Sequence, residues 1–339
     1  MSMAAIRMGI IGCGNFMSTH IPRLLEIDDV EIVGLADPSA ASIARMKERN
    51  PGLQGVPEFA SHQELLRDIR PDAVEIGSPH ALHFEQIVDS LDAGCHVMTE
   101  KPLVCTVAEG EEALRRRERA GTILMVSYQR RYSPAHRYIH EQIKAGAIGR
   151  VQFVTGLQHH GWYWEQRGQW RQDPELSGGG QLIDWGSHLM DCVMYATGLR
   201  ISAVMTHENR YDLDVDVDMT ISARFENGAI GSFAHVGNAA APAAEDMGFY
   251  GSEGTLLLRG VDYNTVDELR HYDARQELVD VGELPAQSSP DHNFVDAILG
   301  RDQVHSSGEG GLDVLRVNEA CWESARTGRE VAVSYSGGR

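Results

Sequence analysis

The first 127 residues alternate short apolar runs with segments whose apolar residues recur at helical spacing, and this alternation constrains the fold most strongly. The apolar runs are Ile6 to Ile11, Glu31 to Ala36, Ala73 to Ile76, His96 to Met98 and Ile123 to Ser127. The helical segments are Ser39 to Arg49, Ser61 to Arg67, Phe84 to Ala93 and Val107 to Ala120. Strands that alternate with helices form a parallel sheet covered on both faces, so the sequence predicts an α/β, Rossmann-like N-terminal domain.

The pattern changes near Val151, where strands with a two-residue period begin. Val215 to Phe225 and Ala229 to His235 are joined by Asn227-Gly228, which is a strong hairpin signal. Further expected strands are Val151 to Gln158, Gly248 to Tyr250 and Thr255 to Leu258. The sequence therefore predicts a C-terminal α+β domain with a largely antiparallel, open sheet.

A chain of 339 residues is long enough for two domains. We expect them to comprise residues 1–128 and 129–339. A last helical pattern, 312–327, stops at Gly328 as a helix end should, and we expect this helix to pack back toward the N-terminal domain.

Charge and cysteine content exclude several partners. The 30 basic and 49 acidic residues give a net charge of −19, which repels nucleic acid and anionic membranes. The five cysteines are spread along the chain without a CxxC pair, as in a cytoplasmic protein with reduced thiols. We expect no signal peptide, no membrane span and no metal site, because Met8 to Ile11 is too short an apolar run and no metal-binding motif is present.

A glycine turn follows the first predicted strand directly. Gly12 permits a tight turn, and Gly14 lets backbone amides approach a pyrophosphate at the start of the next helix. Asn15 and Phe16, which come next, are further candidates for cofactor contact. Met17 stands where such turns usually have a third small residue, so the motif is incomplete and helix packing is expected to differ there.

Asp37 ends the second predicted strand, where a carboxylate accepts hydrogen bonds from an adenosine ribose. That carboxylate would repel a 2′-phosphate, so the sequence favours NAD over NADP. The alternative is a helix cap or turn former, because Pro38 and Ser39 follow, and both roles are compatible.

The chain resembles the Gfo/Idh/MocA family of NAD(P)-dependent sugar and polyol oxidoreductases over nearly its whole length. The stretches that carry the resemblance are Gly12-Cys13-Gly14, Pro79 to His83, Glu100-Lys101-Pro102, Arg130-Arg131-Tyr132 with Pro134, Ser177 to Asp191, Gly251 to Gly254 and Ser324 to Gly328. The resemblance implies a nicotinamide cofactor in the N-terminal domain and a carbohydrate or polyol substrate in the C-terminal one.

The resemblance assigns Glu100 and Lys101 to the cofactor site, with Lys101 touching the substrate as well. A lysine ammonium there can stabilise partial negative charge on the reacting oxygen. The alternative is an ordinary surface lysine at a strand end.

A second loop is also expected beside the nicotinamide. Ser78, Pro79 and His83 are its candidate cofactor contacts, and the alternative for His83 is local bonding at a helix start. His80 stands where the family usually has asparagine, which puts cofactor contacts from this side in doubt.

Asp184, His188 and Asp191 are spaced by four and three residues, which places them near one helix face. By resemblance His188 is the general base, a role that suits an unperturbed pKa of about 6.5, and Asp184 binds substrate or passes on the proton. Asp191 supports the helix or bonds to His188. The alternative is an amphipathic helix whose histidine has ordinary partners.

An aromatic segment supplies further candidates for substrate binding. Trp162, Tyr163, Trp170 and Arg171 combine apolar ring faces with polar donors, as a carbohydrate ring requires. Core or subunit packing explains the composition equally well. Arg131 matches a family arginine that is expected to brace the loop or the substrate pocket, and a surface salt bridge is the competing interpretation.

The sequence thus predicts an NAD-dependent dehydrogenase that oxidises a secondary alcohol of a sugar, sugar derivative or cyclitol. Two alternatives stay open. One is a redox-neutral glycosidase or lyase that holds NAD tightly and works through a transient 3-keto sugar; the other is a non-catalytic NAD-sensing regulator. A homodimer or homotetramer through the open sheet is expected, because such a sheet exposes one face unless something covers it.

Overall fold

The computed structural model describes residues 5–260 and 265–335, and the chain separates into two compact units. Unit 1 comprises residues up to Tyr128 together with Ser288–Leu312, and unit 2 comprises Gln129–Gln287 and the residues from Asp313 onward. The sequence prediction had a single boundary at 128–129. The structure adds that the segment 288–312 belongs with the N-terminal part of the chain.

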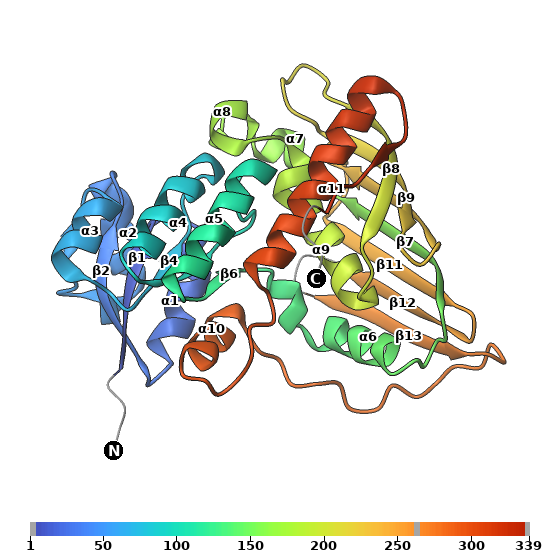
Figure 1. Ribbon diagram of the computed structural model, residues 1–339, viewed down its shortest axis with the longest axis horizontal. Helices are drawn as coiled ribbons and strands as arrows, with labels where there is room; N and C mark the ends of the chain where they lie inside the picture. Colours follow the sequence, from blue (N-terminus) through green and yellow to red (C-terminus); the bar gives the residue numbers. More distant parts are fainter. Residues whose placement is uncertain (1–4, 261–264, 336–339) are drawn as a thin grey trace. The chain divides into compact units, whose positions relative to one another are not determined.

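Unit 1 contains a six-stranded parallel sheet with helices against it (Figure 1). Its strands are β1 (Ile6–Ile11), β2 (Val30–Ala36), β3 (Glu58–Phe59), β4 (Ala73–Ile76), β5 (His96–Thr99) and β6 (Leu124–Val126). Its helices are α1 (Met17–Leu25), α2 (Ala40–Arg49), α3 (His62–Ile69), α4 (His83–Asp92), α5 (Val107–Ala120) and α10 (Pro290–Ile298). The strand order β3-β2-β1-β4-β5-β6 is that of a dinucleotide-binding Rossmann domain, which confirms the predicted fold.

Local sequence signals set the helix ends in unit 1. Ser39 and Ser61 cap α2 and α3 by accepting hydrogen bonds from backbone N–H groups. Thr106 and Glu109 form a reciprocal capping box at the start of α5, and Gly121 ends that helix with a φ of 68°. Each predicted helix of this unit is therefore present within a few residues of its expected bounds.

Unit 2 contains an eight-stranded sheet in the order β13-β12-β11-β7-β10-β9-β8-β14. Its strands are β7 (Val151–His159), β8 (Ile201–Asn209), β9 (Asp218–Phe225), β10 (Ile230–Val236), β11 (Ala244–Gly251), β12 (Gly254–Gly260), β13 (Val266–Asp273) and β14 (Val331–Ala332). Its helices are α6 (Pro134–Lys144), α7 (Trp162–Glu165), α8 (Pro174–Ser177) and α9 (Ser187–Thr197), with most of α11 (Gly308–Thr327). Among the described strands of this sheet, only the β7–β10 pair is parallel, so the predicted largely antiparallel sheet is confirmed.

One predicted strand of unit 2 begins later than expected. The period-two pattern runs from Val215, but β9 starts at Asp218. Val215 and Val217 instead join a buried cluster with Trp162 and Tyr163, so their alternation reflects packing outside the sheet. The side chain of Asp216, between the two valines, turns to the backbone of another segment.

The C-terminal helix lies in both units. Its first turn belongs to unit 1, where Gly308 and Gly311 fit closely against Leu124 and Val126. The rest belongs to unit 2, where the Thr206 hydroxyl of β8 donates to the carbonyl of Cys321 at 2.6 Å. The first turn of this helix is thus grouped with unit 1 and the remainder with unit 2.

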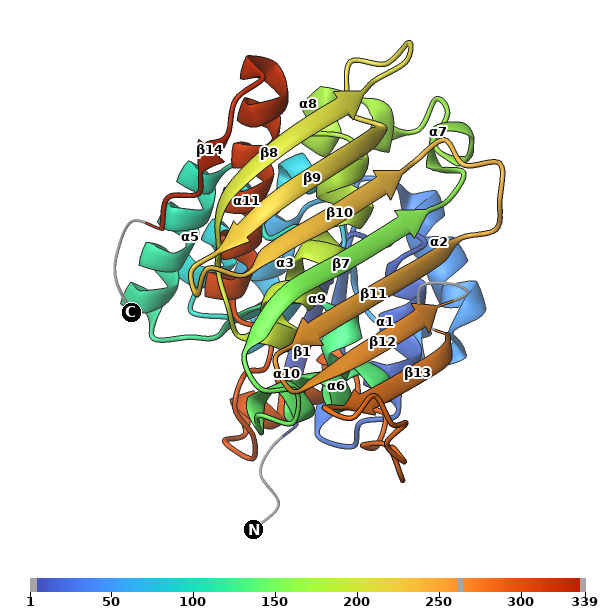
Figure 2. The ribbon, with the colours of Figure 1, turned by 90° about the vertical axis from the view of Figure 1, so that its right-hand side faces the viewer.

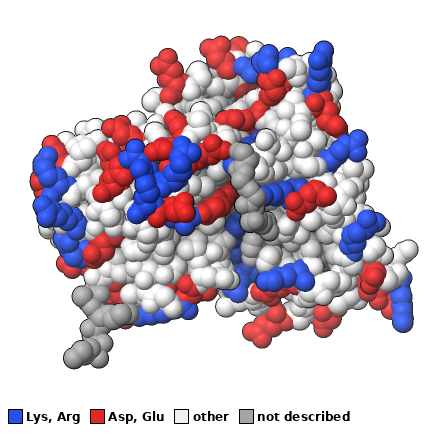
Figure 3. All heavy atoms as spheres, in the orientation of Figure 1, with Lys and Arg blue, Asp and Glu red and all other residues white. Residues whose placement is uncertain are grey.

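Among the described residues, no helix has the length and apolar character that a membrane crossing requires. On the face shown in Figure 3, acidic and basic side chains are interspersed. On α5, for example, Glu112 accepts from both Arg115 and Arg116.

Candidate functional site

The glycine turn lies at the carboxyl end of β1, next to the end of β4. Gly12 has a φ of +86°, and a Cβ there would lie 2.7 Å from the backbone nitrogen of Ser78, so only glycine fits. Gly14 is different, because a Cβ there would meet only the Gly77 carbonyl, at 3.9 Å. The protein's own packing therefore does not require glycine at position 14, whereas a ligand that approaches the backbone would.

Met17 occupies the position of the missing third small residue. It is 1% exposed, and its Cγ and Sδ lie 2.5 Å from where a Cβ of Gly77 would be. The side chain thus fills space that Gly77 leaves open. The altered packing expected here is therefore present: the small residue is Gly77, directly after β4, and the helix supplies the large one.

Asp37 joins the end of β2 to the glycine turn. One carboxylate oxygen accepts from the backbone N–H of Cys13 at 2.8 Å, and the other accepts from the N–H of Ser39 at 2.7 Å. The turn-forming role weighed from the sequence is therefore present. Each carboxylate oxygen has a second lone pair available, so ribose binding is compatible with these bonds.

The two loops expected beside the nicotinamide are tied together by His83. Its buried ring lies with Nδ1 2.8 Å from the carbonyl oxygen of Pro102 and Nε2 3.0 Å from that of Ser78. Burial lowers the pKa of His83, against the opposing effect of these carbonyls. The local helix-start role is therefore not the whole account, because His83 links the Ser78-Pro79 loop to the segment after Lys101.

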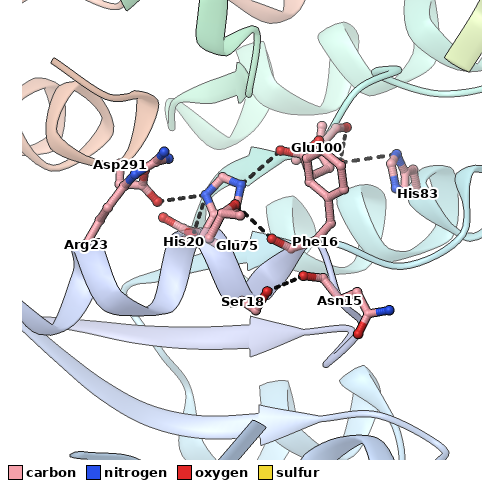
Figure 4. A network of polar contacts seen from close by, with 11 residues as sticks. Asn15, Phe16, Ser18, His20, Arg23, Glu75, His83, Glu100 and Asp291 are labelled. Carbon is pink, nitrogen blue, oxygen red and sulfur yellow. Dashed lines mark hydrogen bonds and ion pairs between the residues drawn. The ribbon is translucent and has the colours of Figure 1, made fainter. Parts of the chain in front are cut away.

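Lys101 is 4% exposed, so it is not an ordinary surface lysine. Its Nζ lies 5.9 Å from the centre of the Phe16 ring, the residue that immediately precedes α1. The adjoining Glu100 accepts a hydrogen bond from His20 at 2.9 Å (Figure 4). Unit 1 therefore brings the glycine turn and the Glu100-Lys101-Pro102 motif together around the start of α1.

In unit 2, Asp184 lies in a π-helical turn, Leu182–Gly186, that precedes α9. Its Oδ2 accepts from the indole Nε1 of Trp162 at 2.9 Å and lies 3.1 Å from Nε of Arg171. The Arg171 guanidinium stacks 4.4 Å above the Trp170 ring. The structure thus joins four residues that the sequence analysis named as separate candidates.

The π-turn also changes the expected spacing on the helix. His188 is the second residue of α9 and is 6% exposed, but the regular 3.6-residue geometry does not hold between it and Asp184. Asp191 lies further along α9 and pairs with Arg131, with Nε to Oδ2 at 2.9 Å. Arg131 therefore forms a buried rather than a surface ion pair.

Tyr163 points its hydroxyl to the carboxylate of Asp212, and the Arg167 guanidinium packs 5.1 Å above its ring. Its ring also joins the buried cluster around Trp162. Core packing therefore accounts for part of the aromatic composition of this segment.

Several residues that shape the site were not singled out from the sequence. Asp216 accepts from the backbone N–H groups of Gly180 and Leu182, at 3.1 and 2.7 Å, and so holds the segment that leads into Asp184. His20 and Asp291 hold Glu100, directly and through one another. Glu75 could have indicated the group around His20 from the sequence. It is a carboxyl group inside the apolar strand Ala73–Ile76, where a buried ionisable residue needs a partner.

Family models match both parts of the chain. Residues 6–128 match the model described as "Oxidoreductase family, NAD-binding Rossmann fold", and residues 136–257 match the GFO/IDH/MocA C-terminal domain. The chain belongs to the GFO/IDH/MocA oxidoreductase family. The resemblance read from the sequence motifs is confirmed.

Relatives of this GFO/IDH/MocA oxidoreductase carry names of dehydrogenases and reductases. It is 27% identical to the 4-carboxy-2-hydroxymuconate-6-semialdehyde dehydrogenase of Sphingobium sp., over 92% of this chain and 96% of that protein. It is 28% identical to the 1,5-anhydro-D-fructose reductase of Ensifer adhaerens, over 96% and 98% of the two chains. The crystal structure of the WlbA dehydrogenase from Bordetella pertussis with NADH and UDP-GlcNAcA has a TM-score of 0.85 at 23% identity, covering 98% of this chain and all of that one, and shares its fold.

Proposed function

We propose that this oxidoreductase uses NAD(H) to oxidise a secondary alcohol of a sugar, sugar derivative or cyclitol to a ketone, or the reverse. The observation that carries the proposal is that Gly14 is exposed and has no close neighbours in the protein. Its lack of a side chain leaves the backbone before α1 accessible to a ligand, although a Cβ there would clash with nothing in the chain. A helix N-terminus with accessible amides suits a pyrophosphate.

The residues that would hold the cofactor all lie in unit 1. They are Gly12, Gly14, Asn15, Phe16, Asp37, Ser78, Pro79, His83, Glu100 and Lys101. The bound nicotinamide supplies the hydride acceptor. We propose that residues 1–128 form the NAD-binding domain and that 129–339 contribute substrate binding and oligomerisation.

The chain's own residues carry out the proton chemistry in this proposal. His188 accepts the hydroxyl proton as general base, and Asp184 assists by binding substrate or passing the proton on. The Lys101 ammonium stabilises negative charge on the reacting oxygen. Support comes from the burial of Lys101 and His188 and from the two donors that fix the Asp184 carboxylate.

NAD is the preferred cofactor in this proposal because of Asp37. Its carboxylate is fixed by two backbone N–H groups at the end of β2. A 2′-phosphate at this place would meet a held negative charge, whereas a ribose diol would donate to it.

The substrate class rests on the aromatic segment and on the relatives. Trp162 and Arg171 contact Asp184, and Trp170 lies under the Arg171 guanidinium. Arg131 lies beside Asp191 in the same unit. The relative from Ensifer adhaerens is named for a sugar derivative, and the WlbA dehydrogenase was solved with a nucleotide sugar acid. Neutral and acidic sugars therefore both belong in the test.

The test is the appearance of NADH by absorbance when purified protein receives NAD+ and a panel of inositols, free pyranoses, sugar acids and glycosides. We expect one substrate class to give a signal that Lys101→Ala and His188→Ala both abolish, while the exposed Lys144→Ala does not. Release of an aglycone from a glycoside without net NADH would instead identify the redox-neutral glycosidase. Tight NADH binding with no turnover of any kind would identify the regulator.

We also propose a homodimer or homotetramer through the sheet of unit 2. Figure 2 shows this sheet face-on, and in the described part of the chain no helix covers the face turned to the viewer. A shallow groove on the sheet is lined by Leu157, Phe233, Tyr250 and Leu257, with Arg270 among its charged residues. Light scattering after gel filtration tests the proposed oligomer, because a monomeric mass would contradict it.

We further propose a cytoplasmic location, which the free cysteines support.

A further inference from the structure

A buried group of ionisable side chains in unit 1 lies directly behind the Glu100-Lys101-Pro102 motif. His20, on α1, is 2% exposed and sits between Asp291 of α10 and Glu100, which follows β5 (Figure 4). Glu75, from the middle of β4, lies beside it, and Arg23 approaches Asp291 from the outside. The group joins positions that are up to 271 residues apart in sequence.

Both nitrogens of the His20 ring face carboxylate oxygens. Nδ1 lies 2.7 Å from Oδ1 of Asp291, and Nε2 lies 2.9 Å from Oε1 of Glu100. An ionised carboxylate only accepts hydrogen bonds, so both ring nitrogens must carry a hydrogen for both bonds to exist. With both carboxyls ionised, the geometry therefore requires an imidazolium.

The surrounding charges agree with this protonation state. Burial alone would lower the pKa of His20, but Asp291, Glu100 and Glu75 together raise it well above its usual 6.5. Burial raises the pKa of Glu75 well above its usual range, with the nearby Asp291 acting in the same direction.

The imidazolium holds Glu100, the residue that directly precedes Lys101. The Glu100 backbone N–H donates to the Ile76 carbonyl at 2.8 Å, and its side chain accepts from His20, so Glu100 is held at both ends. On the other side of Lys101, the carbonyl of Pro102 is held by His83. His20 also lies on α1, the helix that follows the glycine turn. Phe16, directly before this helix, lies under the Lys101 ammonium.

We propose that His20 is a cationic positioning residue for the cofactor site: by bridging Asp291 and Glu100 it sets the place of the Lys101 ammonium relative to the start of α1. It touches neither substrate nor cofactor in this account and acts through Glu100. The inference rests on the proposed use of NAD(H).

A metal ion is the competing occupant of this position. One donor atom each from His20, Glu75 and Asp291 lies within 4.8 Å of the other two, a spacing that a metal can use. A metal would need an unprotonated Nδ1, and its lone pair would then face the Asp291 oxygen at 2.7 Å without a hydrogen between them. We therefore assign the positive charge to the imidazolium and make bound metal an outcome of the test.

The first test reads the ring directly. Protein labelled with ¹⁵N-histidine is examined by NMR from pH 6 to 8, and the His20 signals are identified by their absence in His20→Gln. We expect both ring nitrogens to be protonated across this range. A neutral tautomer, or a stoichiometric metal found by elemental analysis of the wild-type protein and lost in His20→Gln, overturns the proposal.

The second test separates positioning from simple loss of a buried pair. His20→Gln is compared with His62→Gln, a matched control. His62 is also buried and its Nε2 lies 3.0 Å from Oδ2 of Asp89, but this pair is not part of the group around Glu100. We expect His20→Gln to weaken NADH binding and lower kcat by about tenfold each, the usual effect of losing a hydrogen bond to a charged group. His62→Gln should change neither.

A double variant checks that His20 acts through Glu100. Glu100→Gln removes the acceptor's charge, so adding His20→Gln to it should cause little further loss of NADH affinity. Additive losses, or equal effects of His20→Gln and His62→Gln, overturn the proposal. Failure of the wild-type protein to bind any nicotinamide cofactor would instead contradict the proposed function, since the NMR result does not depend on cofactor binding.

Discussion

Arg131 and Asp191 form a buried ion pair in unit 2, with the guanidinium Nε 2.9 Å from Oδ2 and the carboxylate 1% exposed. The guanidinium also packs 5.0 Å above the Tyr195 ring. Asp191 is thus tied to the segment after Tyr128 through Arg131. It follows that the pair chiefly stabilises α9 against the segment after Tyr128.

We predict that Asp191→Asn lowers the free energy of unfolding by about 3 kcal/mol, because it leaves the Arg131 charge buried without its counter-ion. Replacing both partners, in Arg131→Met with Asp191→Leu, should recover most of that loss. Urea denaturation measures both. Glu323→Gln, in an exposed pair with Arg326, is the control and should cost less than about 1 kcal/mol. Losses that add in the double variant would refute the prediction.

Trp162→Phe should lower kcat/KM by about tenfold while leaving NADH affinity unchanged. Phenylalanine keeps the buried ring but removes the indole N–H that donates to Asp184, a hydrogen bond to a charged group. Steady-state kinetics with the substrate found in the panel provides the measurement. The exposed Trp164→Phe is the matched control. An unchanged kcat/KM in Trp162→Phe would show that Asp184 needs no help from the indole.

Asp37→Ala should weaken NADH binding by about tenfold and reduce the difference in affinity between NADH and NADPH. The fixed carboxylate accepts hydrogen bonds from the ribose of NADH and repels the 2′-phosphate of NADPH. Fluorescence titration with each cofactor measures the two affinities. Asp72→Ala is the control, since Asp72 also accepts a backbone N–H, from Arg7 at 2.9 Å. A preference for NADPH in the unsubstituted protein would contradict the role given to Asp37.

Gly12→Ala and Gly94→Ala should differ sharply although both glycines have nearly the same φ, +86° and +85°. Any non-glycine residue there costs about 1–2 kcal/mol. At Gly94 nothing lies within 4 Å of the new Cβ, whereas at Gly12 the Ser78 backbone must move. We therefore expect Gly12→Ala alone to lose NADH binding. Thermal unfolding and NADH titration measure the two effects, and intact binding by Gly12→Ala would show that the turn tolerates a side chain.

His136 should make the protein less stable in mild acid. Burial, with Arg130 nearby, lowers the pKa of His136 to about 3. Below about pH 6.5, His136 is protonated in the unfolded chain but stays neutral in the folded protein. The free energy of unfolding therefore falls as the pH falls, by about 2 kcal/mol at pH 5. His136→Leu should remove this loss, as measured by urea denaturation at pH 7.5 and pH 5.

His20 gives the opposite sign and serves as the comparison. Its pKa is raised in the folded state, so its stabilisation is complete below about pH 6.5 and is lost as the pH rises through the folded value. The cost of His20→Gln should therefore shrink toward alkaline pH. The same pH trend in both variants would contradict the assigned protonation states.

The sequence by itself determined the local elements and the outline of the cofactor site. Periodicity set strands such as Ala73–Ile76 and helices such as Val107–Ala120, because the two-residue and 3.6-residue repeats are properties of neighbouring residues. The glycine turn and Asp37 could be placed for the same reason, since the order of strand, turn, helix and strand fixes which ends of a parallel sheet they occupy.

Only the tertiary structure decided which polar groups meet. His20 and Asp291 are 271 positions apart, and Arg131 and Asp191 are 60 apart, so no local pattern announces either pair. Asp216, just before β9, likewise binds backbone N–H groups of a distant segment, the one that leads into the π-turn before His188. Burial makes each such partner necessary, because a charge or donor removed from water must be compensated by whatever the fold brings beside it.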